Sequence, residues 1–520
     1  MNPKIIQGGD FSDHRGTISY VNDFSFKNIQ RFYIISNSDE NPIRAWQGHK
    51  LDAKNFYCIN GSFKIHFVKI DNWENPSKDL NIETIIVNAS ESKIVHIPAG
   101  YANAIESLET NSKLMSFSTL PLAAVCDDDV RYDSDYWKIM NNKRIFLSLS
   151  QQSGFEQKYI QKALDNNWIT SGGPNVNDFE KVLENYLEED SCVTALNSGT
   201  SAIHLALILL GVKAGDEVIC QSLTFSASAN PILYQGAIPV FVDSEPETWN
   251  ICPENLEIAI QDRITKGKKP KAIIAVHLYG NPYKVDEIHA VAKRYEIPVI
   301  EDSAEALGSS YKGKKCGTFG DFGVLSFNGN KIITTSSGGA LISNSQLLKE
   351  KAIFYATQSK DLAVHYEHSQ IGYNYRMSNV CAGIGLGQME ILEKNINARR
   401  EINRYYETIF KNVDEVELFQ VVNDNFFSNY WLSTILVKPN IEKNITRESL
   451  RLAFENANIE CRPLWKPMHL QPVFSGYPYY GNIVAESLFE KGLCLPSGSS
   501  LTIDDKNRIK EVIKTFFKIV

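Results

Sequence analysis

The sequence predicts an all-β domain followed by a larger α/β domain. The chain has 520 residues, which at about 100–200 residues per domain is enough for two to four domains. Residues from about 5 to 125 form short aromatic and β-branched segments, separated by turns rich in Gly, Asn, Asp and Pro. Beyond about residue 143, apolar strand-like segments alternate with amphipathic helical ones, which is the pattern of a mostly parallel sheet.

The composition excludes several classes of protein. Hydrophobic residues make up 43% and charged residues 22%, so a disordered or fibrous chain is excluded. The net charge of -8 gives no bulk electrostatic reason to bind nucleic acid or an anionic membrane. The longest apolar runs are far shorter than the roughly 20 residues that span a bilayer. The N-terminus lacks the apolar core of a signal peptide, and the nine cysteines include no CxxC pair. We therefore expect reduced thiols and a cytoplasmic protein.

The first domain is predicted from its strands. Segments 31–35, 55–59, 62–70 and 83–87 are short and rich in aromatic and β-branched residues. Many short strands at near-regular spacing, without helical segments between them, favour a jelly-roll barrel. The polar stretch Asp127–Tyr136 is expected to lead the chain out of that barrel. We place the first domain at residues 1–137 and a linker at 138–150.

The second part of the chain is predicted to hold two domains. Buried strands are expected at 272–276 and 298–302, with an amphipathic helix at 285–294 between them. The last stretch mixes strands, such as Trp431–Val437, with helices. We therefore place a large α/β domain at residues 151–405 and a small α+β domain at 406–520.

Three segments of the large domain contain residues suited to chemistry. Asn197-Ser-Gly-Thr-Ser201 joins a strand to a helix, where free N–H groups and hydroxyls form an anion site. Asp302 ends a buried strand, at the edge where ligands bind in open α/β sheets. Lys331 follows another strand among small polar residues. Taken singly, these residues can equally be helix caps or a solvated surface charge. Together and in this order, they are the parts that bind pyridoxal phosphate: a lysine for the aldehyde, a carboxylate for the pyridine nitrogen and a helix start for the phosphate.

A family resemblance supports this interpretation. Residues from about 143 to 520 resemble the DegT/DnrJ/EryC1/StrS sugar aminotransferases, which are fold type I pyridoxal-phosphate enzymes. The matching segments are Asn167-Trp-Ile-Thr-Ser-Gly-Gly-Pro174, Asn197-Ser-Gly-Thr-Ser201, Leu223-Thr-Phe-Ser-Ala-Ser-Ala229, Glu301-Asp-Ser-Ala-Glu-Ala-Leu-Gly308, Ser326-Phe-Asn-Gly-Asn-Lys331 and Gly372-Tyr-Asn-Tyr-Arg-Met-Ser378.

The resemblance implies a role for each matching residue. Lys331 would be the Schiff-base lysine, and Asp302 the partner of the pyridine nitrogen. Phe225 would stack on the ring, and Glu305, where many relatives have Gln, would lie by the ring hydroxyl. Asn374 would reach the phosphate of the neighbouring subunit, so that a homodimer has its active sites at the subunit interface. The residues implied at the phosphate of the same subunit are Gly199, Thr200, Ser201 and Ser326.

The resemblance also narrows the substrate. Segments 220–231, 305–308 and 462–472 look most like the C4 transaminases that make UDP-N-acetylbacillosamine. This implies L-glutamate as the amino donor and a UDP-linked 4-keto-6-deoxy-N-acetylhexosamine as the acceptor. Arg462, Trp465 and His469 are implied contacts of the sugar nucleotide, although a proline-bracketed surface loop is the plainer account of this segment.

The first domain resembles the WxcM-like cupins, which include sugar-nucleotide 3,4-ketoisomerases. The resemblance rests on segments 31–34, 44–50, 61–64 and 96–101. It implies His49 as the base, Tyr33 as the acid and Arg44 on the diphosphate. Gln47 stands where the family has a second histidine, and Gln cannot take a proton. The alternatives are a buried, satisfied His49 in a non-catalytic sugar-nucleotide or dimerisation module, and a metal site that would use His49 and His96. No metal is expected because the ligand set is incomplete.

These observations predict a nucleotide-sugar aminotransferase that makes a 4-amino-4,6-dideoxy sugar for polysaccharide or glycan synthesis. One alternative is an isomerase–transaminase relay, in which the first domain moves the ketone of a dTDP-4-keto-6-deoxyhexose from C4 to C3 and the second aminates C3. Another is a regulatory relative that binds the cofactor without turnover. The nucleotide, the sugar and the configuration at C4 depend on pocket shape and stay open.

Overall fold

The computed structural model describes residues 2–37, 43–137, 143–187 and 190–519. The chain divides into two compact units, Met1–Asn141 and Asn142–Val520, which we call the N-terminal and C-terminal units and describe separately. The predicted linker, 138–150, contains this division. Its residue Ile145 is buried in the core of the C-terminal unit and pairs with Ile459, so this part of the predicted linker packs onto that unit.

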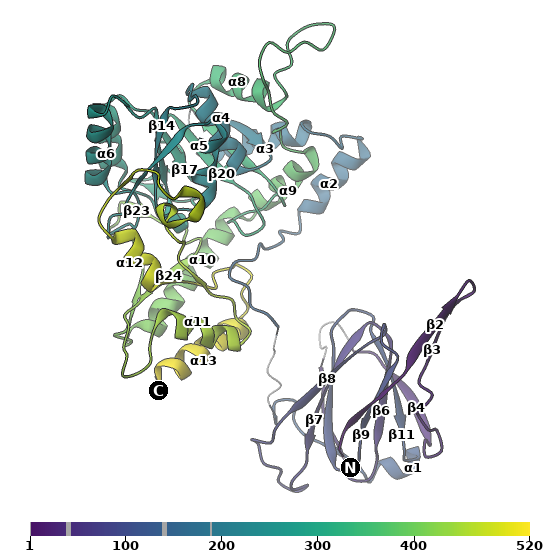
Figure 1. Ribbon diagram of the computed structural model, residues 1–520. Coiled ribbons are helices and arrows are strands. Elements are labelled where there is room, and N and C mark those ends of the chain that lie inside the picture. Colours follow the sequence, from purple (N-terminus) through teal and green to yellow (C-terminus); the bar gives the residue numbers. More distant parts are fainter. Residues whose placement is uncertain (1, 38–42, 138–142, 188–189, 520) are drawn as a thin grey trace. The chain divides into compact units, whose positions relative to one another are not determined.

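The N-terminal unit consists of two five-stranded antiparallel sheets and a projecting hairpin (Figure 1). One sheet has the order β1-β9-β6-β11-β4 and the other β12-β5-β10-β7-β8, while β2 pairs only with β3. The strands are β1 (Lys4–Gln7), β2 (Gly9–Asp13), β3 (Gly16–Tyr20), β4 (Arg31–Ile35), β5 (Ile43–His49), β6 (Lys54–Asn60), β7 (Ser62–Lys69), β8 (Glu83–Asn88), β9 (Lys93–Ile97), β10 (Tyr101–Ser107), β11 (Lys113–Ser118) and β12 (Asp129–Arg131), with a short helix α1 (Leu122–Val125).

The strands of this unit alternate between an apolar inner face and an outer face. Phe56, Phe63, Ile65, Val95 and Leu114 meet in a core to which both sheets contribute. The unit is therefore rich in strands, as predicted, and its four predicted strands are present. The prediction that Asp127–Tyr136 leads away from the sheets is wrong in part. β12 falls within this stretch and pairs with β5.

A mostly parallel eight-stranded sheet forms the centre of the C-terminal unit, as predicted (Figure 1). Its order is β13-β21-β20-β17-β16-β14-β15-β26. The pairs from β20 to β26 are parallel, whereas β21 runs antiparallel to both β20 and β13. The strands are β13 (Cys192–Leu196), β14 (Glu217–Gln221), β15 (Ile238–Val242), β16 (Ala272–Val276), β17 (Val299–Asp302), β20 (Phe322–Ser326), β21 (Gly339–Ser343) and β26 (Tyr479–Tyr480).

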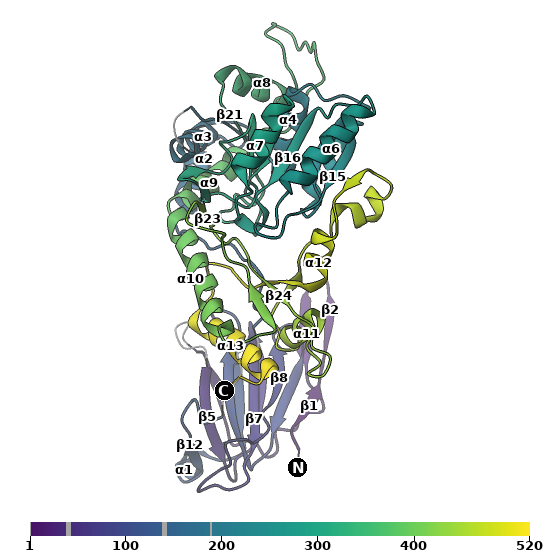
Figure 2. The same ribbon diagram turned by 90° about the vertical axis from the view of Figure 1, so that its left-hand side faces the viewer.

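Helices cover the sheet on both faces (Figures 1 and 2). The strands β14, β16, β17 and β21 are fully buried, as expected for a parallel sheet. The helices of this part are α2 (Glu156–Asp165), α3 (Pro174–Leu187), α4 (Gly199–Leu209), α5 (Asn230–Tyr234), α6 (Pro253–Thr265), α7 (Val285–Arg294), α8 (Gln346–Ala356) and α9 (Asn379–Met389). Short elements add η1 (Ser226–Ser228), η2 (Leu278–Gly280), β18 (Ser310–Tyr311), β19 (Lys314–Lys315) and β23 (Phe426–Phe427).

The last part of the chain forms a smaller α+β layer around a four-stranded antiparallel sheet, β22-β24-β27-β25. The long helix α10 leads into it and buries Ile402 and Tyr406 in its core. The elements are α10 (Leu392–Phe410), β22 (Val416–Leu418), β24 (Ser433–Val437), α11 (Arg447–Asn456), β25 (Arg462–Pro463), η3 (Met468–Leu470), η4 (Pro472–Phe474), α12 (Val484–Lys491), β27 (Gly492–Leu495) and α13 (Ile503–Phe517). None of the described helices is long and apolar enough to cross a membrane.

Candidate active site

Asp302 is the last residue of the central strand β17, at the carboxyl edge of the sheet. Its carboxylate is buried and accepts a 2.6 Å hydrogen bond from Ser228 Oγ and a 3.2 Å bond from the Ala304 N–H. Ser228 is in turn bonded to Thr224 Oγ1 at 2.8 Å. These bonds hold the side chain in one orientation at the edge where open α/β sheets bind their ligands.

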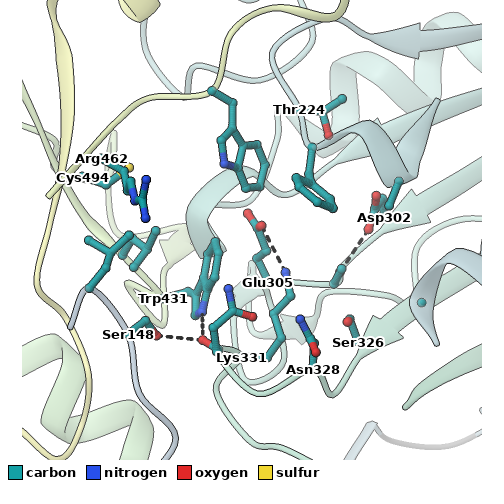
Figure 3. Close-up of a pocket in the computed structure, with 18 of the residues that line it drawn as sticks. Ser148, Thr224, Asp302, Glu305, Ser326, Asn328, Lys331, Trp431, Arg462 and Cys494 are labelled. Carbon is teal, nitrogen blue, oxygen red and sulfur yellow. Dashed lines mark hydrogen bonds and ion pairs between the residues drawn. The ribbon is translucent and has the colours of Figure 1, made fainter. Parts of the chain in front are cut away.

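Lys331 lies on the connection between β20 and β21, at the same edge of the sheet. Its Nζ is 3.3 Å from Glu305 Oε1 and 4.4 Å from the ring centroid of Trp431 (Figure 3). Glu305 is buried, and its other oxygen accepts a 2.8 Å bond from the Tyr279 N–H. The amine is therefore held in a small space between a carboxyl group and an indole face.

The start of α4 forms a third wall of the same region. Ser198 caps the helix, and its Oγ accepts the N–H of Ser201 at 3.1 Å. The backbone is packed closely here: a Cβ on Gly199 would lie 3.1 Å from the Cβ of Ser326, and one on Gly339 would lie 2.3 Å from the Gly199 nitrogen. Because the first N–H groups of a helix have no partner within it, this corner is suited to an anion.

These three features border one cavity of about 590 Å³, a size that is usual for small-ligand sites. In Figure 3, Lys331, Glu305 and Trp431 lie between Asp302 on one side and Arg462 on the other. The predicted site residues that line the cavity are Gly199, Thr200, Phe225, Asp302, Glu305, Ser326, Lys331, Arg462 and Trp465. The structure thus brings together most of the residues named for the cofactor and two of those named for the substrate.

Two residues predicted at the cofactor phosphate do not line the cavity. The hydroxyl of Ser201 donates to Asn197 Oδ1 at 2.6 Å, so Ser201 completes the turn that precedes α4. Asn374 is exposed, and its backbone carbonyl accepts a 3.1 Å bond from Asn197 Nδ2. Its neighbour Arg376 is tied to Glu180 and to the carbonyl of Ala195. The Asn374 side chain is thereby held at the surface beside the α4 turn.

His469 is placed away from the cavity, contrary to the sequence-based expectation of a substrate contact. Its ring stacks on Tyr479 at 3.7 Å, with Nδ1 2.7 Å from Ser222 Oγ and Nε2 3.3 Å from Glu486 Oε1. Both ring nitrogens are engaged inside the protein because the proline-rich segment folds back against the sheet. Because His469 does not line the cavity, the structure gives its predicted substrate contact no support.

Several residues that line the cavity were not predicted as site residues from the sequence. Thr224, Asn328 and Asn330 lie inside the segments that carry the family resemblance, so those segments could have identified them. Other lining residues come from distant parts of the chain: Phe146, Leu147, Ser148, Leu149, Trp431, Glu460 and Cys494. No local pattern marks these residues, since they approach Lys331 only when the small α+β layer packs on the sheet.

The donor set fits pyridoxal phosphate. An amine, a buried carboxylate and a glycine-lined helix start face one cavity, at a corner where a glycine Cβ would fill the space beside Ser326. These groups match the aldehyde, the pyridine nitrogen and the phosphate respectively. The C-terminal unit has the fold and the site of a pyridoxal-phosphate-dependent sugar aminotransferase.

Comparison with known proteins identifies the family. Residues 150–514 match the DegT/DnrJ/EryC1/StrS aminotransferase family, and the chain belongs to that family. It is 48% identical over 73% of its length to the putative pyridoxal phosphate-dependent aminotransferase EpsN of Bacillus subtilis, covering 97% of that protein. It is 41% identical over 70% of its length to the GDP-perosamine synthase of Escherichia coli O157:H7, covering 96% of it.

Two further matches are a transaminase with a named sugar substrate and a solved structure of the family. The UDP-4-amino-4,6-dideoxy-N-acetyl-beta-L-altrosamine transaminase of Campylobacter jejuni 81-176 is 33% identical over 68% of the chain and 92% of that protein. The crystal structure of a DegT DnrJ EryC1 StrS aminotransferase from Brucella abortus superposes with a TM-score of 0.65 at 31% identity, over 70% of this chain and 95% of that one. The enzyme is thus a transferase that uses pyridoxal phosphate.

Glu305 makes the stability of the cofactor-free protein depend on pH. Burial raises the pKa of this carboxyl to about 7, an effect that the nearby Lys331 opposes. The folded protein therefore binds the proton more tightly than the unfolded chain does. This contribution to stability is full below about pH 4.5 and is lost as the pH rises through 7.

Because Gln cannot titrate, Glu305→Gln removes this dependence. Between pH 5 and 8 we expect the wild-type protein to lose roughly 2.5 kcal/mol of unfolding free energy relative to the variant. Denaturant titrations of both cofactor-free proteins at the two pH values measure the difference. Parallel stability curves for the two proteins would contradict the assignment.

The strand register of the N-terminal unit directs two of the predicted residues toward the space between its sheets. His49 is the partner of Tyr101, and Arg44 of Ile105, and both partners belong to the core. Tyr33 is the partner of Ser116, two residues from the core residue Leu114. Since cross-strand partners share a face, His49 and Tyr33 project inward from the two sheets, whereas Arg44 is exposed.

His49 is buried, and neither ring nitrogen has a hydrogen-bond partner in the structure. Its Nδ1 lies 3.6 Å from Asp128 Oδ2, a carboxylate that the backbone N–H groups of Lys50, Leu51 and Asp52 hold in place. Burial and the nearby Lys54 lower the pKa of His49, which favours a neutral ring at neutral pH. His49 is therefore not a core histidine whose two ring nitrogens are both hydrogen-bonded.

Gln47 and His96 do not join His49 as a pair of bases or metal ligands. The side-chain amide of Gln47 donates to Asp129 Oδ1 at 2.8 Å. His96 is bonded to Asn55 at 2.7 Å and alternates with the core residues Val95 and Ile97, so it faces away from the core. Among the described residues, no group of three or more His, Cys, Asp or Glu side chains is placed to hold a metal ion.

Proposed function

We propose that the C-terminal unit transfers the amino group of L-glutamate to C4 of a UDP-linked 4-keto-6-deoxy-N-acetylhexosamine. The observation that carries the proposal is the single cavity that joins Lys331 and Asp302 to Arg462 and Trp465. One site must accept a small diacid and then a nucleotide sugar, and a cavity that extends from a buried amine to an exposed guanidinium is suited to both. The 4-amino-4,6-dideoxy sugar in the name of the Campylobacter relative supports such a product.

The residues of the chain have distinct parts in this reaction. When bound, pyridoxal phosphate supplies an electron sink for bond breaking at the α carbon of the donor. Lys331 Nζ is placed to accept that α proton and, in the second half-reaction, to deliver a proton at C4 of the sugar. Asp302 keeps the pyridine nitrogen protonated, and the start of α4 with Ser326 binds the phosphate.

Arg462 is proposed to bind the diphosphate of the nucleotide sugar. Its side chain is 67% exposed and is held by Glu460, at 2.7 Å, at the border of the cavity. A planar guanidinium is suited to paired phosphate oxygens. We expect Arg462→Ala to raise KM for the nucleotide sugar about tenfold, or about 1.4 kcal/mol, with kcat nearly unchanged.

The control for this prediction is Arg451→Ala, which removes an arginine of helix α11 paired with Glu448. Steady-state kinetics with both substrates varied give the two KM values. A nucleotide-sugar KM equal to that of the control would show that Arg462 does not contact the substrate.

The proposed homodimer is supported by the surface around Asn374. This residue is exposed on the segment that follows a loop with four strongly exposed apolar side chains, Leu362, Val364, Tyr366 and Ile371. Large apolar side chains at the surface often mark an interface. In the proposed dimer, Asn374 of one subunit approaches the phosphate site of the other.

The N-terminal unit is proposed to be a WxcM-like cupin that binds a nucleotide sugar. A buried His49 with unpaired ring nitrogens beside a fixed carboxylate supports a second candidate function. In this relay, His49 acts as the base that moves the ketone from C4 to C3, and the C-terminal unit then aminates C3. The bond between Gln47 and Asp129 opposes a two-histidine version of that chemistry.

Product analysis by mass spectrometry and NMR separates these candidates. The enzyme is incubated with glutamate and one of three sugars. These are the UDP-linked 4-keto-6-deoxy-N-acetylhexosamine, a GDP-linked 4-keto-6-deoxyhexose and a dTDP-linked 4-keto-6-deoxyhexose. A C4 amine from the UDP sugar, retained in His49→Ala, supports the first proposal. A C3 amine from the dTDP sugar that requires His49 supports the relay. If glutamate does not bleach the visible absorbance of the bound cofactor, the protein is instead a silent relative.

A further inference from the structure

One arginine of the C-terminal unit is buried without a carboxylate partner. Arg399, on α10, is fully buried. Its guanidinium donates to the backbone carbonyl of Trp431 and, at 3.1 Å, to Ser148 Oγ, while its Nε has no hydrogen-bond partner. Burial lowers the pKa of this group to about 9. Burying a charged group without full hydrogen bonding lowers the stability of the folded protein. A compensating role for Arg399 is therefore expected.

Both acceptors of Arg399 belong to the wall of the active-site cavity. Ser148 Oγ donates a 2.7 Å bond to the carbonyl of Asn330, and Trp431 Nε1 donates another 2.7 Å bond to the same carbonyl. Figure 3 shows the two bonds meeting at one oxygen beside Lys331. Asn330 precedes Lys331, so this doubly bonded carbonyl belongs to the peptide group that carries the lysine.

The same helix also holds the other side of Lys331. Asn395, one turn before Arg399 on α10, donates from Nδ2 to the carbonyl of Ile332 at 3.2 Å. Helix α10 thus fixes the residue after Lys331 directly, and the residue before it through Ser148 and Trp431. The indole of Trp431 also lies under the lysine amine, 4.4 Å away. These contacts restrain both the backbone and the amine of Lys331.

We propose that Arg399 is a positioning residue that fixes Lys331 by holding Ser148 and the Trp431 backbone against the Asn330 carbonyl. The inference rests on the proposed function only for its activity measurement. Misplacing a reacting group by about 1 Å can cost on the order of a hundredfold in rate, so a clamp on this peptide group affects proton transfer more than substrate binding. Arg399 itself does not line the cavity.

The test replaces the guanidinium with an apolar side chain of similar length, Arg399→Met, and compares it with Arg399→Lys and with Arg400→Met. Arg400 is the neighbouring arginine of α10, but it donates to Ser428 and packs on Phe427, away from the clamp. We expect Arg399→Met to lower the rate of the glutamate half-reaction about 30-fold, with KM for glutamate changed less than threefold. Arg399→Lys should restore part of the rate, and Arg400→Met should match wild type.

A second measurement does not depend on activity or on the sugar substrate. Hydrogen exchange of the cofactor-free protein, followed by mass spectrometry, reports the opening of the segment 328–334. We expect Arg399→Met to speed exchange there at least tenfold, with Arg400→Met unchanged. The glutamate half-reaction needs no sugar, so a wrong assignment of the acceptor leaves both measurements valid.

Two milder variants keep the proposal testable if Arg399→Met does not fold. Ser148→Ala and Trp431→Phe each remove one bond to the Asn330 carbonyl. Each should slow the half-reaction about three- to tenfold and speed local exchange, and the effects of Ser148→Ala and Arg399→Lys together should be less than additive. The proposal is overturned if a folded Arg399→Met keeps wild-type rate and exchange, or if the milder variants leave exchange at 328–334 unchanged.

Discussion

Replacing Lys331 with Ala is expected to reduce transamination to below about a thousandth of the wild-type rate. A positioned general base contributes about 10²- to 10⁴-fold, and in the proposed function Lys331 also provides the amine that holds the cofactor aldehyde. Of the described residues that line the cavity, it is the only lysine. No neighbouring amine can therefore replace it. The measurement is the steady-state rate with glutamate and nucleotide sugar, together with the visible absorbance of the bound cofactor.

The control is Lys266→Ala, which removes an exposed lysine just after helix α6 that pairs with Asp262. It should retain wild-type activity. A small primary amine added to Lys331→Ala should restore part of the rate, because the missing group is a base and not a structural support. If a folded, cofactor-containing Lys331→Ala kept more than a tenth of the activity, the assignment of the base would be wrong.

Asp302→Asn is expected to lower kcat/KM about 10²- to 10³-fold in both half-reactions. The substitution keeps the size of the side chain and an oxygen that can accept the bond from Ser228, but it removes the negative charge. Breaking one half of a buried, hydrogen-bonded charge pair costs about 3–5 kcal/mol. With the carboxylate gone, the pyridine nitrogen is no longer held protonated, so the bound ring is a weaker electron sink.

Asp262→Asn is the matched control: this half-exposed carboxylate of helix α6 pairs with Lys266 and does not line the cavity, so its loss should leave both rates unchanged. Half-reactions are followed separately, with glutamate in one and with the amino-sugar product in the other. A loss limited to one half-reaction would point to a substrate contact, since the pyridine nitrogen serves both.

Much of the C-terminal unit could be predicted from local patterns. The strand at 272–276 and the helix at 285–294 occur at the predicted residues, because a buried strand and an amphipathic helix have distinct periods. Asp302 and Lys331 lie at one edge of the sheet, as parallel strands require. In contrast, β12 was not predicted from the sequence because three residues, two of them charged, are too few to show a strand pattern. Its place depends on the bonds that Asp128 accepts from the N–H groups of Lys50 and Leu51, just after β5.

The remaining part of the site depends on tertiary packing. Ser148 and Trp431 are 283 residues apart, yet both bind the carbonyl of Asn330. No pattern marks the segment around Ser148, and the strand pattern at 431–437 does not indicate where the indole of Trp431 points. His469 shows the same dependence on packing: its segment resembles a substrate loop, whereas its ring stacks on Tyr479 and does not line the cavity. Residue types in a segment indicate a candidate site, whereas the direction of each side chain depends on how the segment packs.

The two ends of the cavity differ in composition: closely packed glycines lie at one end, and large side chains at the other. At the proposed phosphate corner, Gly199 lines the cavity and packs so closely on Gly339 that a Cβ on Gly339 would meet the Gly199 backbone. Arg462, Glu460 and Trp465 form the far end with side chains. Point mutations replace side chains and leave peptide groups in place. Point mutations during evolution can therefore change the side chains of the far end one at a time, and with them the sugar or nucleotide that is proposed to bind there. The backbone of the cofactor corner stays the same. If the far end binds the sugar nucleotide, as proposed, this division accounts for relatives whose names include both GDP- and UDP-linked sugars.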